Sequence, residues 1–502
     1  MIQKNLTYIL TIIFFFISLW VVSYHEMWRD EFQSWFLARD SNSLKELFHN
    51  LKYEGHTGLW HLILFPTTRI FASPTSMQYL HIFISSISIF ILFKWSPFNL
   101  LQKILLSFGY FLFFEYSIIA RNYALSILLI FVFCTLFKKR KTYPLSLSLV
   151  LFLLCHTNIF GIIFSLSFFF MICLEDFFIK KKNFNFKLPK NYLTPLIIIM
   201  IGLITSIIQI IPPSDSTFAP GWNFDISFKK IIAMIARLVN GYFPIPNLNI
   251  NFWNSNIFYL NEFSQIIGLV ITIITVCIFS IFFISRPSVF FHYFFIIASL
   301  LLFFLIKYDG STRHHGFFFI GLISSLWIHS NCQNFRFFLV LVDFKEIHRS
   351  TINILLNFLL IIQLLISAIS TSQEYKYPFS GGKETAEFIN NNNLANSQII
   401  GHPTSLTLSV LGYLENIKFY DLSKRELSTF FRYDSKSYIV NYEILYDTSL
   451  KLASSGDKVI LILNQNIEDS FGNKANQNFY KIFESTNAIV KSEKFYVYIF
   501  FK

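Results

Sequence analysis

The sequence predicts an α-helical membrane protein with about eleven transmembrane helices, followed by a C-terminal soluble α/β domain. Three observations indicate this fold class. The 502-residue chain is 54% hydrophobic and only 14% charged, and 64 of its residues are phenylalanine. Its apolar residues gather in many runs close to the length, about 20 residues, that a helix needs to cross the hydrocarbon core of a bilayer. A soluble domain would not bury this much apolar surface.

Eleven apolar runs are long enough to be read as spans. They lie near residues 6–22, 77–93, 100–115, 122–137, 143–157, 158–175, 193–211, 263–284, 288–306, 316–330 and 351–370. Only the polar triplet His156-Thr157-Asn158 divides the stretch 143–175 into two. The first run is expected to stay in the protein, because the following Ser23-Tyr24-His25-Glu26 is a poor signal-peptidase site.

Basic residues gather on alternate connections between the spans. They are Lys4, Lys94, Lys103, Lys138, Lys139, Arg140, Lys141, Lys180, Lys181, Lys182, Lys187, Lys190, Arg286, Arg336, Lys345 and Arg349. Because such connections stay on the cytoplasmic side, we expect a multi-pass protein of the cytoplasmic (inner, plasma) membrane, with its N-terminus inside and its C-terminal domain outside. These connections account for most of the net charge of +12, so nucleic-acid binding is not expected.

With this orientation, a membrane domain of residues 1–370 has outer-face loops at 23–76, 212–262 and 307–315. The first loop contains a capped amphipathic segment, 41–48, typical of a helix lying on the membrane surface. The second is rich in proline and aromatic residues, with a helical patch near 226–240. It is either a mobile lid or an ordinary interfacial aromatic segment.

Residues 371–502 are expected to form the extracytoplasmic α/β domain, because short apolar runs alternate with polar helical stretches. The strands are expected at 398–401, 417–420, 458–463 and 495–500, and the helices at about 381–392, 404–414 and 440–455. Neither a GxGxxG nor a Walker sequence is present, so the sequence does not support nucleotide binding.

The adjacent acids Asp30 and Glu31 follow the first span within about eight residues. Arg29 precedes them, and Arg39 follows two to three helical turns later. A carboxylate near the membrane interface can accept a proton from a hydroxyl group, especially where desolvation raises its pKa. An ion-pair cluster that fixes the start of a surface helix would explain the same residues.

A second group of charged residues lies in the turn between the third and fourth spans, where Glu115 and Arg121 are close in sequence. An arginine can hold a phosphate through two parallel hydrogen bonds, although pairing with Glu115 is the alternative. Histidines and cations near the same membrane face are His56, His61, His156, Lys307, Arg313 and His314. They suit an anionic head group better than a metal, since no HExxH spacing is present.

Three short stretches give the chain a family resemblance: Arg29-Asp30-Glu31, Tyr53-Glu54-Gly55-His56 and Ala120-Arg121-Asn122-Tyr123. Together with the topology, they resemble the GT-C membrane glycosyltransferases, nearest in pattern to the protein O-mannosyltransferase and aminoarabinose transferase group. The chain also looks like a bacterial subgroup of membrane proteins that share these stretches and a Tyr-Pro-Phe-Ser-Gly-Gly turn, here residues 377–382.

The resemblance implies that the chain moves a sugar from a polyprenyl-phosphate donor to an acceptor hydroxyl on a lipid, glycan or protein, with inversion. Asp30 would be the base and Glu31 would orient the acceptor or the sugar. Arg121, with Arg313 or His314, would stabilise the departing phosphate. The residues expected to bind substrate are Arg29, Arg39, Glu54, His56, Glu115, Arg121, Tyr123, His156, Lys307, Arg313 and His314.

The metal-dependent branch of that family usually carries Asp-x-Asp in its first outer loop, whereas this chain has Asp-Glu. No cofactor is therefore expected, and dependence on a divalent metal stays open. A transporter or flippase of lipid-linked saccharides is an alternative function, as is a polymerase or ligase. A transporter would favour charges within mid-span cavities and repeated halves, and the sequence shows no repeat.

Overall fold

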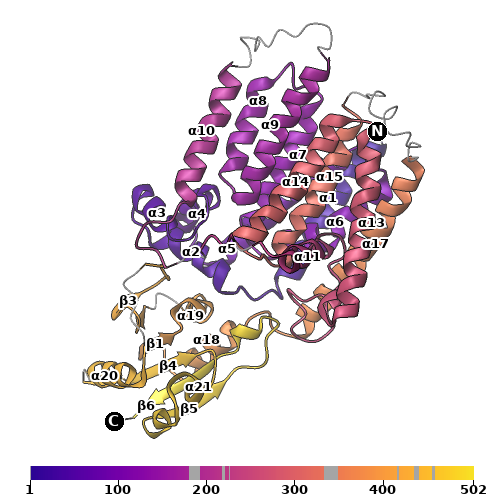
Figure 1. Ribbon diagram of the computed structural model, residues 1–502. Helices are drawn as coiled ribbons and strands as arrows, with labels where there is room; N and C mark the ends of the chain where they lie inside the picture. Colours follow the sequence, from indigo (N-terminus) through magenta and orange to yellow (C-terminus); the bar gives the residue numbers. More distant parts are fainter. Residues whose placement is uncertain are drawn as a thin grey trace.

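The computed structural model describes residues 2–179, 193–217, 221–224, 226–332, 349–414, 418–434, 440–454 and 458–501. A bundle of long helices lies next to a smaller domain, which contains all the described strands (Figure 1). The N-terminus lies at the far end of the bundle and the C-terminus in the smaller domain. The basic residues Lys180–Lys182, Lys187, Lys190, Arg336 and Lys345 lie outside the described residues.

Seven described helices are long and apolar enough to cross a membrane. They are α1 (Ile2–Val22), α5 (Thr75–Trp95), α9 (Ile159–Ile179), α10 (Leu193–Ile210), α13 (Glu262–Ile284), α14 (Pro287–Ile306) and α17 (Arg349–Lys376). Two shorter apolar helices, α7 (Tyr123–Phe137) and α8 (Pro144–Cys155), lie among them. The expected division at residues 156–158 is present, because α8 ends before it and α9 begins after it.

Two of the expected spans are less regular. The run at 100–115 forms α6 (Leu100–Phe108) and then a separate π-helix, η1 (Phe111–Ile118). The run at 316–330 belongs to α15 (Thr312–His329), which carries Arg313, His314 and His315 in its first turn. The coarse prediction of a polytopic helical protein therefore agrees with the helices, while the structure supports seven membrane-length helices and not the full count of eleven.

Three short helices follow α1 at the end of the bundle nearest the smaller domain (Figure 1): α2 (Arg29–Asp40), α3 (Leu44–Leu51) and α4 (Leu59–Ile70). The expected surface helix is α3, and the Ser43 side chain accepts a hydrogen bond from the Glu46 amide at its start. Farther along, α11 (Phe228–Arg237) matches the helical patch, and α12 (Val239–Tyr242) and the 3₁₀ turn η3 (Ile257–Tyr259) complete that loop.

The C-terminal domain contains a six-stranded sheet with strand order β3-β2-β1-β4-β6-β5. The strands are β1 (Gln398–His402), β2 (Phe419–Asp421), β3 (Glu426–Ser428), β4 (Val459–Leu463), β5 (Phe479–Glu484) and β6 (Tyr496–Phe500). The central strands β2, β1 and β4 are parallel, and the outer strands pair antiparallel. The short β3 and the strand β5 are the two that sequence did not predict.

Side chains alternate between the two sides of this sheet, so each side has its own core. Ile399, Ile460, Ile462 and Val497 join a core that also contains residues of α18 (Gly382–Asn391), α19 (Thr404–Leu411) and α2. The other side packs against α20 (Tyr442–Ala453) and α21 (Ile467–Phe471). The 3₁₀ turns η4 (Asn473–Gln477) and η5 (Lys491–Glu493) complete the domain.

The shared core fixes α2 against the C-terminal domain. Phe32 of α2 is fully buried, and its ring packs edge-on against Tyr413, just after α19. Gly412 lies so close that a Cβ atom there would stand 2.0 Å from the Phe32 ring. Only glycine fits at this approach without displacing the helix. The helix that begins with Arg29-Asp30-Glu31 is thus held between the two parts of the protein.

Candidate functional site

The first turn of α2 carries two acids, as the partial positive charge of a helix N-terminus favours. Because they are consecutive, their side chains diverge: Glu31 is fully buried and Asp30 remains 27% exposed. The neighbours of each acid therefore indicate different roles.

Asp30 lies at the centre of an ion cluster. Its Oδ2 atom is 2.6 Å from Nη1 of Arg121 and 3.4 Å from Nη2 of Arg313, and its Oδ1 atom is 3.7 Å from Nε of Arg29. Burial alone would raise the pKa of Asp30, but the three guanidinium groups, Arg121 first, hold it below its usual value. The cluster contains three positive charges around one negative charge, so it retains net positive charge.

The backbone around Arg121 is fixed by groups from two other helices. Oε1 of Glu31 accepts a 2.7 Å hydrogen bond from the Ala120 amide. His81 of α5 accepts one from the Arg121 amide at 3.2 Å, and its other ring nitrogen lies 3.0 Å from the Ser117 carbonyl oxygen. Asp30 thus contacts the Arg121 side chain while its neighbour Glu31 fixes the preceding peptide. The first turn of α2 thus positions both the side chain of Arg121 and the peptide that precedes it.

Arg313 enters the cluster from the first turn of α15. Its guanidinium lies 5.2 Å from the centroid of the Trp28 ring and 5.3 Å from that of Trp253, a cation–π arrangement on two indoles. The Tyr116 hydroxyl donates to the Arg313 carbonyl oxygen at 2.6 Å. Trp253 comes from the loop before α13, so the 212–262 segment contributes directly to the site.

Glu115 is not a partner of Arg121. Its Oε2 atom accepts hydrogen bonds from the Tyr110 hydroxyl at 2.8 Å and from the indole nitrogen of Trp253 at 3.2 Å. The alternative that Arg121 is simply paired with Glu115 is therefore wrong. Glu115 instead holds Trp253, one of the two rings beside Arg313.

Glu31 belongs to a buried network that the sequence did not reveal. Its Oε2 atom lies 3.0 Å from Nε2 of His25 and accepts a 3.2 Å hydrogen bond from the Trp28 amide. The other ring nitrogen of His25 contacts Glu374 at the end of α17. Burial would lower the pKa of His25, but the two carboxylates raise it to about 10. Glu31 therefore faces protein groups and ties together three segments of the chain.

Glu54 and His56 lie beside the Asp30 cluster. Oε1 of Glu54 accepts a 2.6 Å hydrogen bond from the side-chain amide of Gln33. Burial raises the pKa of Glu54 to about 7, with the negative charge of Asp30 adding to the effect. Burial also lowers the pKa of His56 to about 4, and the positive charges of Arg121 and Arg313 contribute. The charges of the Asp30 cluster therefore affect the pKa of both residues.

Of the other expected site residues, Tyr123 and His314 lie near Arg313, whereas Arg39, His156 and Lys307 contact other groups. The ring of Tyr123 stands edge-on to that of His314, which also contacts Tyr308 near Arg313. Arg39 forms a local pair with Asp40 at 2.6 Å, ten residues after Arg29. His156 contacts Thr205 and the Phe152 carbonyl oxygen, and Lys307 lies over the Trp222 ring. The ion partners of Asp30 in the described part of the chain are instead Arg29, Arg121 and Arg313.

Several residues of the site carried no recognisable sequence signal. Gln33 bonds both Glu54 and the backbone of Phe431 in the C-terminal domain. The Arg29 amide donates to Glu493 at 3.2 Å, and the Met27 amide donates to the Tyr413 hydroxyl at 2.7 Å. The three contacts with the C-terminal domain join residues 386 to 464 positions apart in sequence, and even Gln33 and Glu54 are 21 residues apart, so no local pattern indicated them.

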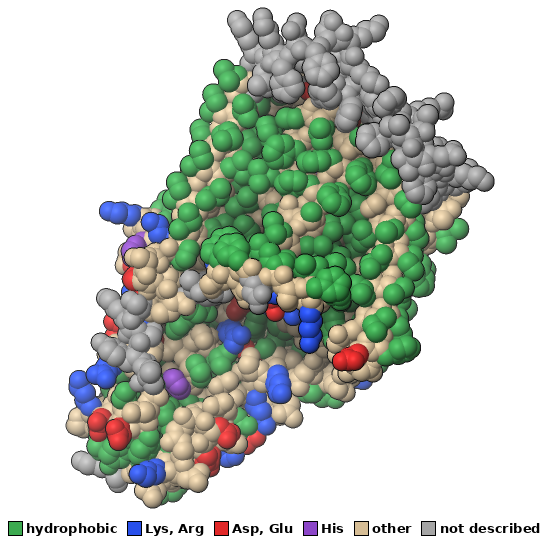
Figure 2. Space-filling view, viewed as in Figure 1, with side chains coloured by type: hydrophobic (Ala, Val, Ile, Leu, Met, Phe, Trp, Pro, Cys, Tyr) green, Lys and Arg blue, Asp and Glu red, His purple; other side chains and the backbone are tan. Residues whose placement is uncertain are grey.

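The surface is hollowed between the helical bundle and the C-terminal domain, and acidic and basic side chains are visible within this hollow (Figure 2). The apolar side chains of the bundle surround its upper edge. Within the described ranges, no group of three or more histidine, cysteine or acidic residues is arranged to hold a metal ion.

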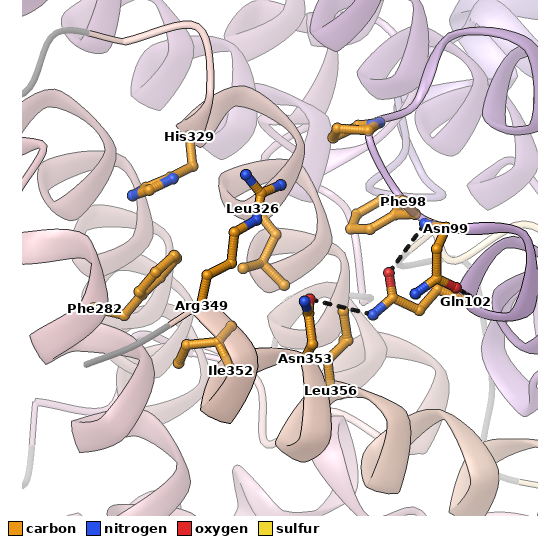
Figure 3. A pocket seen from close by; sticks show the side chains of 11 residues that line it. Phe98, Asn99, Gln102, Phe282, Leu326, His329, Arg349, Ile352, Asn353 and Leu356 are labelled. Carbon is orange, nitrogen blue, oxygen red and sulfur yellow. Dashed lines mark hydrogen bonds between the residues drawn. The ribbon is translucent and has the colours of Figure 1, made fainter.

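A separate cavity of about 120 Å³ lies at the opposite end of α15 (Figure 3). Asn99, Gln102, His329, Arg349 and Asn353 line it together with apolar side chains. Gln102 donates to Asn353 at 3.4 Å and to Asn357 at 3.1 Å. Arg313 and His329 are sixteen residues apart on one helix, so roughly 24 Å separates this cavity from the Asp30 cluster. It is not part of the same site.

Comparison of the chain with protein-family models, with curated proteins and with solved structures found no match.

Proposed function

We propose that the protein is an inverting glycosyltransferase that moves a sugar from a polyprenyl-phosphate donor to an acceptor hydroxyl on the outer face of the cytoplasmic membrane. One observation carries the proposal: Arg29, Arg121 and Arg313 surround the single carboxylate of Asp30 where a bundle of membrane-length helices meets a polar domain. An anionic group attached to a lipid would meet both the apolar helices and the surplus positive charge.

The arginines suit the chemistry of a phosphate leaving group. When the bond between the sugar and the phosphate breaks, the phosphate gains negative charge, and catalysis depends on stabilising that charge. Arg121 and Arg313 present planar guanidinium groups that are 9% and 12% exposed, respectively. Asp30 holds both side chains, two indole rings flank that of Arg313, and His81 fixes the Arg121 backbone, so little reorganisation is needed when a phosphate arrives.

Glu31 acts in this proposal by positioning and not by touching the sugar. Its side chain is fully buried, and its two oxygens accept backbone hydrogen bonds from Ala120 and Trp28. It holds the Arg121 turn against the start of α2. The role first expected for it, orienting the acceptor or the sugar, would need an oxygen that faces the hollow.

The lipid part of the donor has an apolar surface close to the arginines. Helix α11 exposes Phe228, at 77%, and Ile232, while its last residue Arg237 pairs with Asp309 at 3.1 Å, just before α15. An amphipathic helix of this kind lies in the membrane interface. It would place isoprenoid units beside the segment that leads to Arg313.

Transfer of a radiolabelled sugar from polyprenyl-phosphate donors tests the function. The purified protein in lipid nanodiscs should release polyprenyl phosphate and label an acceptor, and Asp30→Asn should abolish transfer. Asp40→Asn is the matched control, because this acid lies on the same helix but pairs only locally with Arg39. Wild-type rates in Asp30→Asn would overturn the assignment of the site. Movement of intact donor across the bilayer without bond cleavage would instead show a flippase.

A further inference from the structure

Two carboxylates of the site have opposite surroundings. Asp30 has three guanidinium groups within 3.7 Å. Among the residues that the structure describes, Glu54 forms no ion pair within 4.0 Å, and its side chain accepts a hydrogen bond from the neutral amide of Gln33. A proton is held weakly by a carboxylate surrounded by cations and more strongly by one without them.

The position of Glu54 is fixed relative to Asp30. Gln33 follows Asp30 by three residues in α2, so the two side chains lie on the same side of the helix. The Gln33 amide is itself held, because its nitrogen donates to the Phe431 carbonyl oxygen at 2.6 Å and its oxygen accepts from the Phe431 amide at 3.1 Å. Glu54 is therefore kept beside the cluster by a side chain that cannot rotate freely.

The charges around Glu54 are those of the site. Asp30 and Arg121 both affect its pKa, in opposite directions, and the pKa of Tyr433 in the C-terminal domain is raised first by burial and then by the charge of Glu54. Burial is the largest cause of the rise in the pKa of Glu54 to about 7. Two acids whose pKa values are pushed apart in this way are typical of divided roles at an active site.

Resting on the proposed function, we infer that Glu54 is the base that accepts the proton of the acceptor hydroxyl, while Asp30 stays ionised and organises the arginines. The acceptor oxygen forms the new bond to the anomeric carbon as the bond from that carbon to the phosphate oxygen breaks. The bonding electrons leave with the phosphate, which the arginines stabilise. The proton moves to Glu54 and from there to water.

The test is the pH dependence of single-turnover transfer in nanodiscs, with a polyprenyl-phosphate sugar as donor. Wild-type rates should rise with pH through an apparent pKa of about 7, because only the ionised carboxylate can accept the proton. Glu54→Gln should lower the rate by about 10²-fold or more and remove this rise. The affinity for the donor should change little, since the arginines remain in place. Glu54→Asp should restore part of the rate.

Glu46→Gln is the matched control, because among the described residues this partly exposed acid of the neighbouring α3 forms its hydrogen bonds with Asn42 and Ser43, at the start of its own helix. It should keep both the rate and the pH profile of the wild type. Near wild-type transfer by Glu54→Gln, or an unchanged pH profile, would overturn the inference and leave the proposed function standing. Absence of transfer by the wild type with every polyprenyl-phosphate donor would overturn both.

Discussion

Two ion clusters at opposite ends of α7 differ in the balance of their charges. At its start, Arg121 shares Asp30 with Arg29 and Arg313, so three cations meet one acid. Beyond its other end, Arg140 lies 3.5 Å from Glu175 and 3.9 Å from Asp176, so among the described residues one cation meets two acids. Within that part of the chain, both acids share the charge of Arg140. The first cluster has charge available for an anion that is not part of the chain.

The positive-inside tendency explains only one of these clusters. Arg140 belongs to the basic connection after α7, where retained cations are expected. Arg121 and Arg313 lie at the other end of the bundle, which would face outward in the proposed orientation, where that tendency would disfavour arginine. Surplus cations in a disfavoured place indicate a function that maintains them.

The largest effect should distinguish the two clusters directly. Arg121→Gln should reduce sugar transfer by about 10²–10³-fold, the loss typical of removing one group that stabilises developing charge. Arg140→Gln should leave transfer nearly unchanged in protein that folds. Steady-state transfer by both variants in the same nanodiscs measures the difference. Equal losses in the two variants would contradict the view that only the Asp30 cluster is catalytic.

The second-largest expected effect is a loss of folding stability when Glu31 is replaced. Glu31→Gln should lower the free energy of unfolding by about 3 kcal/mol, because it breaks a buried ion pair with His25. Asp40→Asn should cost less than about 1 kcal/mol, since its pair is partly exposed. Unfolding in mixed micelles with increasing SDS gives both values.

The pH dependence of that stability has a definite sign. The pKa of His25 is raised to about 10 in the folded protein, above its ordinary value of about 6.5. The stabilisation is therefore complete below about pH 6.5 and declines as the pH rises through about 10. A difference between wild type and Glu31→Gln that grew with pH would contradict the protonated His25 bridge.

A smaller effect is expected at Arg313. Its contact with Asp30 is longer, at 3.4 Å, than that of Arg121 at 2.6 Å. Arg313→Gln should slow transfer by about tenfold, equivalent to about 1.4 kcal/mol for one charge-assisted hydrogen bond. Arg237→Gln, which removes the nearby pair with Asp309, serves as the control. A larger loss for Arg313→Gln than for Arg121→Gln would reverse the order of the two arginines.

Much of the local structure was predictable because it depends on neighbouring residues. The break at residues 156–158, the capped helix α3 and four of the six strands follow from polar interruptions, caps and short apolar runs. The strand β3 was missed because it has three residues and pairs on one side only. The strand β5 was missed because its apolar residues do not alternate with polar ones, and of these only Phe479 is buried.

The sequence indicated which charged residues belong to the site, but not which residues most of them contact. Asp30, Arg121 and Arg313 were expected in one site through the family resemblance, and the structure brings them together. The alternative pairing of Glu115 with Arg121 was wrong, because Glu115 accepts a hydrogen bond from Trp253, 138 residues farther along the chain. The network of Glu31 with His25 and Glu374 depends on a contact across 349 residues. Such pairings come from packing of whole helices, which no local pattern records.

The contact between Gln33 and Phe431 has a consequence for the way the two parts of the protein are aligned. One side chain of α2 pairs with both polar groups of a single residue, as an adjacent strand would. A shift of one residue in that loop would place the backbone groups of a neighbouring residue opposite Gln33. The Gln33 amide thus selects which residue of the C-terminal domain lies against α2, and so fixes how this domain is aligned with the helix.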